Sequence, residues 1–217
     1  MAAFPKALQS ELNSLCATAR WCYTRGWVPA TSGNFSVRFT RRSGDSIFIT
    51  PSGLDKGLLK PSHLLEVDSG GRHKGASQKT PARRPSAETG LHRVLYAARP
   101  AAHAILHVHT VWNTLLSGHC AHQPHIAITG YEILKGLSGV TSHEHEELVP
   151  LLANTQDYPS LEAEMKAALD DYPAAHGVLL TRHGLYTWGQ SVAEARRHLE
   201  ALEFLFEIEA RRLMGSQ

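Results

Sequence analysis

Two histidines separated by one residue carry the clearest chemical signal in this sequence. His107 and His109 lie in residues 104–109, a stretch that predicts a strand with both imidazoles on one face. Residues two apart along a strand lie roughly 7 Å apart, so both rings can converge on one ion at about 2.1 Å from each nitrogen. Two such histidines beside a buried apolar run are costly without a partner. The pair therefore predicts a metal site rather than two hydrogen-bonded histidines at a strand end.

A metal ion held in this way needs a third ligand, and the sequence offers several. His183 comes directly after residues 177–181, an apolar stretch that predicts a buried strand, and Gly184 lets the backbone turn sharply there. Active sites of α/β proteins lie at such strand ends, which favours His183. The other candidates lie in predicted loops: His143, His145, His119, His122 and His125. Spacing alone leaves the choice open.

Two glutamates are candidates for proton transfer. Glu88 lies in the first turn of a predicted helix, where an acid is also expected simply because it interacts favourably with the helix dipole. Glu132 follows a predicted strand and Gly130, and the same structural explanation applies to it.

Two glycine turns predict a place for a phosphate group. Residues 31–34 and 50–53 combine exposed backbone N–H groups with hydroxyls, an arrangement that can hold an anion. Most turns of this composition are only turns, but a helix start nearby strengthens the case, because helix N-termini attract phosphate. The candidate phosphate-binding residues are Ser32, Gly33, Asn34, Ser52, Gly53 and Ser86.

A mixture of helices and strands has to position these residues. Apolar residues at spacings of three and four predict helices, short apolar or alternating runs predict strands, and glycine and proline mark the ends. The predicted helices are 6–25, one capped by Ser86 and ended by Pro100, 111–117, 161–172 and 191–213. The predicted strands are 31–38 (which begins as a turn), 46–50, 104–109, 127–129, 149–152, 177–181 and 185–188, with a helical turn at 131–137. This mixture predicts one layered α/β domain, 1–217.

Composition narrows the class of protein. Of 217 residues, 42% are hydrophobic and 19% charged, as in an ordinary globular protein. A net charge of +2, from 22 basic and 20 acidic residues, argues against a nucleic-acid surface, and the basic stretch 72–84 is expected to be a solvated loop. There is no apolar run long enough for a membrane span and no secretory signal, and Cys16, Cys22 and Cys120 fit reduced thiols. We therefore expect a cytoplasmic protein without a membrane or nucleic-acid partner.

Taken together, the motifs resemble the class II aldolase and adducin superfamily. The resemblance extends from about residue 12 to residue 205 and is carried, in chain order, by residues 32–38 (Ser-Gly-Asn-Phe-Ser-Val-Arg), 49–53 (Ile-Thr-Pro-Ser-Gly), 85–88 (Pro-Ser-Ala-Glu), 107–109 (His-Val-His) and 182–184 (Arg-His-Gly). Residues 84–92, 130–136, 149–150 with 154–157, and 182–189 are similar to the branch that dehydrates methylthioribulose 1-phosphate. The basic stretch 72–84 is longer than expected for the superfamily and contains no candidate catalytic residue.

The resemblance implies a fold, a cofactor and a reaction. The implied fold has three layers, α/β/α, around a central mixed, mostly antiparallel sheet, and the implied assembly is a homotetramer. One zinc ion per subunit would be held by His107, His109 and His183. The implied reaction is loss of water from 5-methylthioribulose 1-phosphate, a sugar phosphate, giving 2,3-diketo-5-methylthiopentyl 1-phosphate in methionine salvage. Such an enzyme is a hydro-lyase.

The resemblance also implies roles for both glutamates. Glu132 matches the acid and base of the dehydratases, and Glu88 matches a catalytic glutamate of the sugar-phosphate aldolases. We expect Glu132 to move the proton and rank Glu88 second. The dipole at a helix start keeps Glu88 ionised and weakens it as a base, whereas partial desolvation over a substrate would raise the pKa of Glu132.

Two other functions fit parts of this pattern. A class II sugar-phosphate aldolase or 4-epimerase, acting on fuculose or ribulose phosphates, would use the same metal and phosphate turns, because acidifying a proton beside a polarised carbonyl serves all three reactions. Residues 131–135 favour dehydration. A metal-free scaffold like the adducin head domain is disfavoured, because a scaffold has no need of three histidine ligands.

Overall fold

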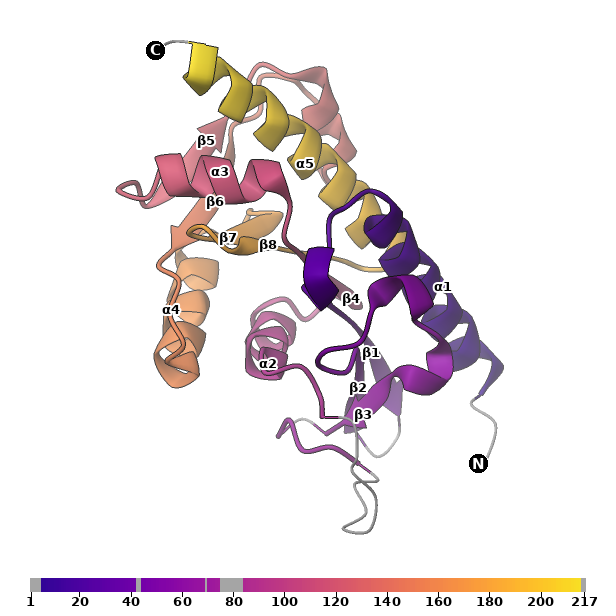
Figure 1. Ribbon diagram of the computed structural model, residues 1–217. Helices are drawn as coiled ribbons and strands as arrows, with labels where there is room; N and C mark the ends of the chain where they lie inside the picture. The colour runs from indigo at the N-terminus through magenta and orange to yellow at the C-terminus, as the bar shows by residue number, and fades with distance from the viewer. Residues whose placement is uncertain (1–4, 42–43, 69, 75–83, 216–217) are drawn as a thin grey trace.

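An eight-stranded sheet forms the centre of the molecule (Figure 1). The computed structural model describes residues 5–41, 44–68, 70–74 and 84–215, so most of the basic stretch 72–84 lies outside the described residues. The strands are β1 (Asn34–Arg41), β2 (Gly44–Ile49), β3 (Leu65–Val67), β4 (Ala104–Val108), β5 (His125–Ile128), β6 (Glu147–Leu152), β7 (Gly177–Leu180) and β8 (Gly184–Gly189). Their order in the sheet is β3-β2-β1-β4-β8-β7-β6-β5.

Strand direction decides which loops share an edge of the sheet. Neighbouring strands pair antiparallel except β6 and β7, which are parallel, so the sheet is mixed and mostly antiparallel. Because β8 lies antiparallel between β4 and β7, those two strands run in the same direction and end at the same edge. Strand β5 runs opposite to both, and its end lies at the other edge.

Helices cover both faces of this sheet and make three layers, as the resemblance implied. They are α1 (Lys6–Thr24), α2 (Thr89–Ala98), α3 (Val111–His119), α4 (Tyr158–Asp171) and α5 (Val192–Gly215), with short 3-10 helices η1 (Pro29–Thr31), η2 (Lys56–Leu58), η3 (Pro61–His63) and η4 (Glu132–Gly136). Leu106 and Val108 of β4 belong to a core with α1, α3 and α5, whereas Ile105 belongs to a core with α2 and α4. Figure 1 shows α1 and α5 on one side of the molecule and α2 and α4 on the other.

Most predicted elements exist, and two differ for local reasons. Helix α2 begins at Thr89 rather than after Ser86, because Ser86 Oγ accepts a hydrogen bond from the backbone N–H of Glu88 within the preceding turn (3.3 Å). Strand β3 was not predicted, since three residues are too few to show an alternation. No helix within the described residues is long and apolar enough to cross a membrane.

Candidate active site

Three histidines from two separate parts of the chain meet at one edge of the sheet. His107 is on β4, His109 follows that strand, and His183 lies in the turn between β7 and β8. One ligand atom from each lies within 4.8 Å of the other two. This is the one such group among the described residues, and none of the alternative loop histidines takes part in it. The pairing of β4 and β7 with β8 brings the three expected ligands together.

Hydrogen bonds select which ring nitrogens face this cluster. His107 Nδ1 lies 3.0 Å from the carbonyl oxygen of Leu185, so Nδ1 carries the hydrogen and Nε2 keeps its lone pair. His183 Nδ1 lies 3.1 Å from Asn154 Oδ1, which selects the same tautomer. The Nε2 atoms of His107 and His109 lie 2.8 Å apart. Remote hydrogen bonds of this kind orient metal-binding histidines and fix their tautomer.

Burial keeps two of these imidazoles uncharged. Desolvation lowers the pKa of His107 to about 4, against the opposing effect of the Glu88 carboxylate. Desolvation also lowers the pKa of His109 to about 2, helped by the neighbouring histidines. The neutral ring is the form that binds a metal. The donor set, three imidazoles with an open side, fits a divalent metal ion in a catalytic site.

Glu88 supplies the carboxylate at this cluster. Its Oε2 lies 3.3 Å from His107 Nε2, and its Oε1 lies 3.3 Å from His183 Nε2. Burial by itself would raise the pKa of Glu88, but the positive charge of His107 or His183, when either ring is protonated, and a hydrogen bond from Asn34 hold that pKa well below its usual range. A carboxylate held ionised in this way is a weak proton acceptor.

A buried chain of hydrogen bonds holds Glu88 in place. Asn34 Nδ2 donates to Glu88 Oε2 (2.6 Å), which leaves Asn34 Oδ1 to accept from His92 Nε2. The Nδ1 of His92 then accepts from Ser36 Oγ (2.7 Å), and Ser36 Oγ lies 2.9 Å from the hydroxyl of Tyr96. Asn34 was expected to bind substrate, and its side chain also supports Glu88. Sequence reasoning missed the three residues behind it, because nothing in the sequence shows that α2 packs beside β1.

A small polar cavity of about 190 Å³ opens beside Glu88 and His109. The oxygen of Ser32 is buried there and has no hydrogen-bond partner among the described residues, so it is available to a ligand. Gly33 and Gly53 adopt φ of +70° and +71°, which shapes both turns. All six residues expected to bind phosphate line the cavity: Ser32, Gly33, Asn34, Ser52, Gly53 and Ser86.

Lys56 is a second residue that sequence reasoning missed. It lines the same cavity and is 1% exposed. Its Nζ donates to the carbonyl oxygens of Thr31 (2.5 Å) and Leu54 (3.0 Å), so it ties one phosphate turn to the other. Burial lowers the pKa of Lys56 to about 8. A lysine within Leu-Asp-Lys-Gly is expected to be an exposed charge on a loop. The sequence gives no sign that Lys56 is buried in the folded protein.

Glu132 does not lie at this site within one chain. It follows β5, whose end is at the opposite edge of the sheet from the ends of β4 and β7. Strands β8, β7 and β6 separate β5 from β4, a distance of about 19 Å at about 4.8 Å per strand. The Glu132 side chain is 71% exposed and pairs with Lys135 (2.5 Å) and His143 (3.4 Å). The expectation that Glu132 lies over the substrate is therefore wrong for a single chain.

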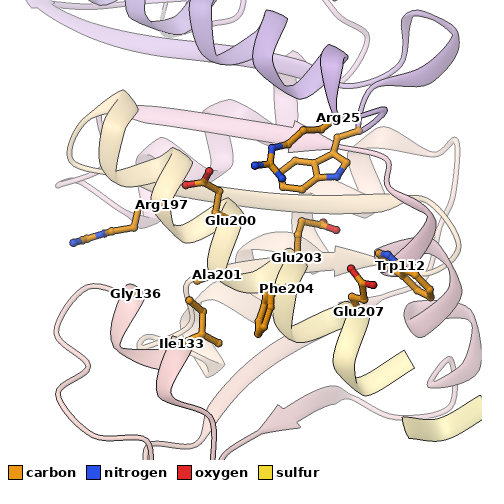
Figure 2. A pocket seen from close by; sticks show the side chains of 11 residues that line it. Arg25, Trp112, Ile133, Gly136, Arg197, Glu200, Ala201, Glu203, Phe204 and Glu207 are labelled. Carbon is orange, nitrogen blue, oxygen red and sulfur yellow. The ribbon is translucent and has the colours of Figure 1, made fainter. Parts of the chain in front are cut away.

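The neighbour of Glu132 belongs to a different cavity, on the outer surface of α5 (Figure 2). Ile133 and Phe204 line this cavity of about 440 Å³, together with the charged side chains of Arg25, Arg197 and Glu207. None of its lining residues is a histidine. Figure 2 shows Ile133 facing Phe204 across the gap between the η4 segment and α5.

Comparison with known proteins identifies the family of this chain. A model of the class II aldolase and adducin N-terminal domain matches residues 13–210. The chain belongs to this family. Two curated relatives are each named methylthioribulose-1-phosphate dehydratase. The protein from Sorangium cellulosum is 44% identical over 202 residues, which are 93% of this chain and 92% of that protein. The protein from Yersinia enterocolitica is 42% identical with the same coverage.

Solved structures of the family share the fold. A putative aldolase/epimerase/decarboxylase from Escherichia coli, YgbL, has a TM-score of 0.72 at 25% identity and covers 94% of this chain and 89% of its own. L-fuculose-1-phosphate aldolase from Thermus thermophilus has a TM-score of 0.71 at 25% identity and covers 96% and 99%.

Proposed function

We propose that this class II aldolase-family chain is a methylthioribulose-1-phosphate dehydratase. It converts 5-methylthioribulose 1-phosphate into 2,3-diketo-5-methylthiopentyl 1-phosphate and water, a step of methionine salvage. The observation that carries the proposal is one site in which three histidines, a buried carboxylate and a hydroxyl-lined cavity adjoin. The relatives that share 42–44% of their residues with the chain over nearly its whole length carry the same name.

The cofactor in this proposal is zinc, one ion per subunit, held by His107, His109 and His183. Three imidazoles with an open position are the donor set of catalytic zinc. A bound zinc ion supplies a Lewis acid that polarises the C2 carbonyl and makes the C3 proton more acidic. Glu88 keeps its negative charge beside the ligand nitrogens, so it orients the ligands and balances positive charge.

The phosphate group of the substrate binds in the cavity beside Glu88. The free hydroxyl of Ser32 and the glycine turns offer donors to phosphate oxygens, and Ser86 adds a hydroxyl before α2. Lys56 keeps the two turns at a fixed spacing and adds a positive charge. Binding at this end orients the sugar carbons toward the histidines.

The proton-transfer residue in this proposal is Glu132 of a second copy, in a homotetramer. It removes the C3 proton and returns it to the departing C4 hydroxyl, after which the enol becomes the diketone. Neighbours lower the pKa of both glutamates within one chain, so the choice of Glu132 rests on its match to the acid and base of the dehydratases. Since Glu132 and its own chain's histidines lie at opposite sheet edges, only another copy brings the two together.

Mixing two inactive variants tests this arrangement. His183→Ala copies lack a metal ligand and Glu132→Gln copies lack the base, but a mixed tetramer can join an intact cluster with an intact Glu132. Random assembly should restore about a quarter of the wild-type activity. The matched control mixes His183→Ala with His107→Ala, two changes within one chain's histidine cluster, and should restore none. A Glu132→Gln mixture as inactive as the control would remove Glu132 of a second copy from the mechanism.

A direct assay tests the reaction class. Incubation with methylthioribulose 1-phosphate should yield the diketone and no carbon–carbon cleavage product. Cleavage or epimerisation of ribulose or fuculose phosphates, with no diketone, would instead assign the aldolase or epimerase activity.

A further inference from the structure

A second open groove, of about 660 Å³, adjoins the histidine cluster. It lies between η1, the start of α3 and the turn between β7 and β8. Two of the three metal-site histidines, His109 and His183, line it. The phosphate cavity is lined by His109 and Glu88. The groove and the phosphate cavity therefore adjoin the same cluster and share His109.

The groove differs from the phosphate cavity in its chemistry. Pro29, Val111 and Leu115 contribute apolar surface, and the last two are one helical turn apart on α3. Val111 is 73% exposed and Leu115 is 42% exposed, so both keep apolar surface in water. Exposing a large apolar side chain to water is unfavourable. Val111, two residues after the proposed ligand His109, is therefore suited to bind the apolar part of a ligand.

Much of the polar lining already has partners within the protein. Asn154 Oδ1 accepts from His183, and the Thr114 hydroxyl donates to the carbonyl oxygen of His183 (3.4 Å). Among the described lining residues, the polar groups that remain for a ligand are the side chains of Gln156 and Arg182 and the amide nitrogen of Asn154. The groove thus presents an apolar floor on α3 with a polar rim.

We propose that this groove receives the methylthio end of the substrate and that Val111 and Leu115 determine specificity for it. The inference rests on the proposed function, because it takes the substrate to have a phosphate at C1 and a thioether at C5. With the phosphate in its cavity and C2 at the cluster, three carbon–carbon bonds and one carbon–sulfur bond carry the sulfur about 5 Å further. His109 lines both the phosphate cavity and the groove, so a substrate held at the cluster can extend from one into the other. Covering apolar surface is favourable for a thioether and unfavourable for a hydroxyl.

The hydrogen-bond donors of the two cavities decide which end of the substrate binds in which cavity. The phosphate cavity has the unpartnered Ser32 hydroxyl, two glycine turns and Lys56. The groove has one cation, Arg182, which is exposed at its rim, and its walls carry three apolar side chains. A doubly charged phosphate gains more from the donors of the cavity, which leaves the apolar end for the groove.

The test compares two substrates that differ at C5. Methylthioribulose 1-phosphate carries a methylthio group there, and ribulose 1-phosphate carries a hydroxyl. Val111→Ser and Leu115→Ser should each lower kcat/KM for the thioether substrate about 4- to 15-fold, the cost of uncovering one or two methylene equivalents. Turnover of ribulose 1-phosphate and zinc content should stay near wild type. Leu58→Ser, at another exposed leucine (66% exposed), is the matched control and should change neither substrate.

The possible outcomes distinguish a failure of the groove assignment from a failure of the proposed function. A wild-type chain that fails to dehydrate methylthioribulose 1-phosphate disproves the proposed function, and the groove assignment with it. An active wild type whose two variants keep the wild-type ratio between substrates disproves the groove assignment alone. An equal loss for both substrates, or a changed oligomeric state on gel filtration, would show that Val111 and Leu115 support the fold or a subunit contact, and would also overturn it.

Discussion

At the scale of single residues, the hydrogen bond made by one ring nitrogen of a histidine decides whether the other nitrogen keeps a lone pair for a metal. The contacts of His107 Nδ1 with Leu185 and of His183 Nδ1 with Asn154 turn both Nε2 lone pairs to the cluster. Desolvation keeps His107 and His109 neutral. The proposed ligands are therefore oriented before a metal binds, and losing one should leave an incomplete site.

We predict that His107→Ala or His109→Ala lowers both bound zinc and turnover. A catalytic zinc site requires its three protein ligands, so each variant should retain well under one zinc per chain. Metal analysis and the dehydration assay on the same samples measure both effects. His122→Ala, at an exposed loop histidine, is the control. Full zinc and normal turnover in His109→Ala would exclude that residue as a ligand.

Glutamine variants of the two glutamates should lose activity for different reasons. Glu132→Gln should lose about 10²- to 10⁴-fold in turnover, the usual contribution of general acid–base catalysis, and should keep its zinc. Glu88→Gln removes the charge beside His107 and His183, so it should mainly weaken zinc binding and recover activity as zinc is added. Turnover against zinc concentration for both variants distinguishes the roles. An inactive but zinc-loaded Glu88→Gln would make Glu88 the base.

At the scale of elements, pairing of β4 with β8 builds the site. His107 faces Tyr186 across this pair, and their rings stack with centroids 3.9 Å apart. Gly184 begins β8 in contact with the same region. A Cβ there would lie 2.4 Å from the carbonyl oxygen of Val108 and 2.9 Å from His109 Cδ2.

Gly184→Ala should therefore destabilise the fold and displace the ligands. Overpacking of this kind lowers the unfolding free energy by about 1–3 kcal/mol. Displacement of the histidines by the added Cβ should lower zinc affinity as well. Thermal unfolding and zinc titration measure both. The control is Gly215→Ala, where a Cβ meets no atom within 4 Å. Unchanged zinc affinity in Gly184→Ala would mean that β8 does not set the ligand positions.

Helix α5 also supports the site through Glu203. Its carboxylate accepts from Thr110 Oγ1 (2.6 Å) and Asn113 Nδ2 (2.8 Å) at the start of α3, next to His109. Burial raises the pKa of Glu203 from 4.5 to about 7, against those two hydrogen bonds. A raised carboxyl pKa means that ionisation costs the folded state more than the unfolded state, so stability falls as pH rises from about 4.5 to 7.

Glu203→Gln should remove that penalty. An amide keeps a donor and an acceptor for Thr110 and Asn113, and it does not ionise. The variant should gain up to about 3 kcal/mol in unfolding free energy relative to wild type between pH 4.5 and pH 8. Denaturant unfolding of both proteins across this range measures the difference. A difference that does not change with pH would show that Glu203 is already ionised at pH 4.5.

The elements were largely predictable, and the relations between them were not. The apolar spacing of α1 and the strand at 104–108 gave bounds within one residue of the structure, because those patterns depend on neighbours in the chain. Asn34 and His92 meet only because β1 packs beside α2. Glu132 was misplaced for the same reason: sequence order does not show that β6, β7 and β8 lie between β5 and β4.

At the scale of the whole molecule, the proposed base and the metal ligands lie at opposite edges of one sheet. If copies complete one another's sites, activity per chain should fall on dilution as the proposed tetramer dissociates, while bound zinc per chain stays constant. Turnover, zinc content and mass, followed over a dilution series, test this. Activity that persists in a single-chain fraction would place the whole reaction in one copy.

If the histidine cluster binds zinc as proposed, the pairing of β4 with β8 also governs when the ion can bind. His107 and His183 are far apart in the sequence, so an unfolded chain pays a loop-closure cost to bring them together. Their cluster exists only after a long-range strand pairing, and such pairings form slowly. Zinc should therefore bind late in refolding, at the rate at which Trp188 on β8 becomes buried. In a variant that keeps Trp188 as its one tryptophan, stopped-flow zinc uptake and Trp188 fluorescence should follow one time course, so zinc uptake would report when the sheet closes.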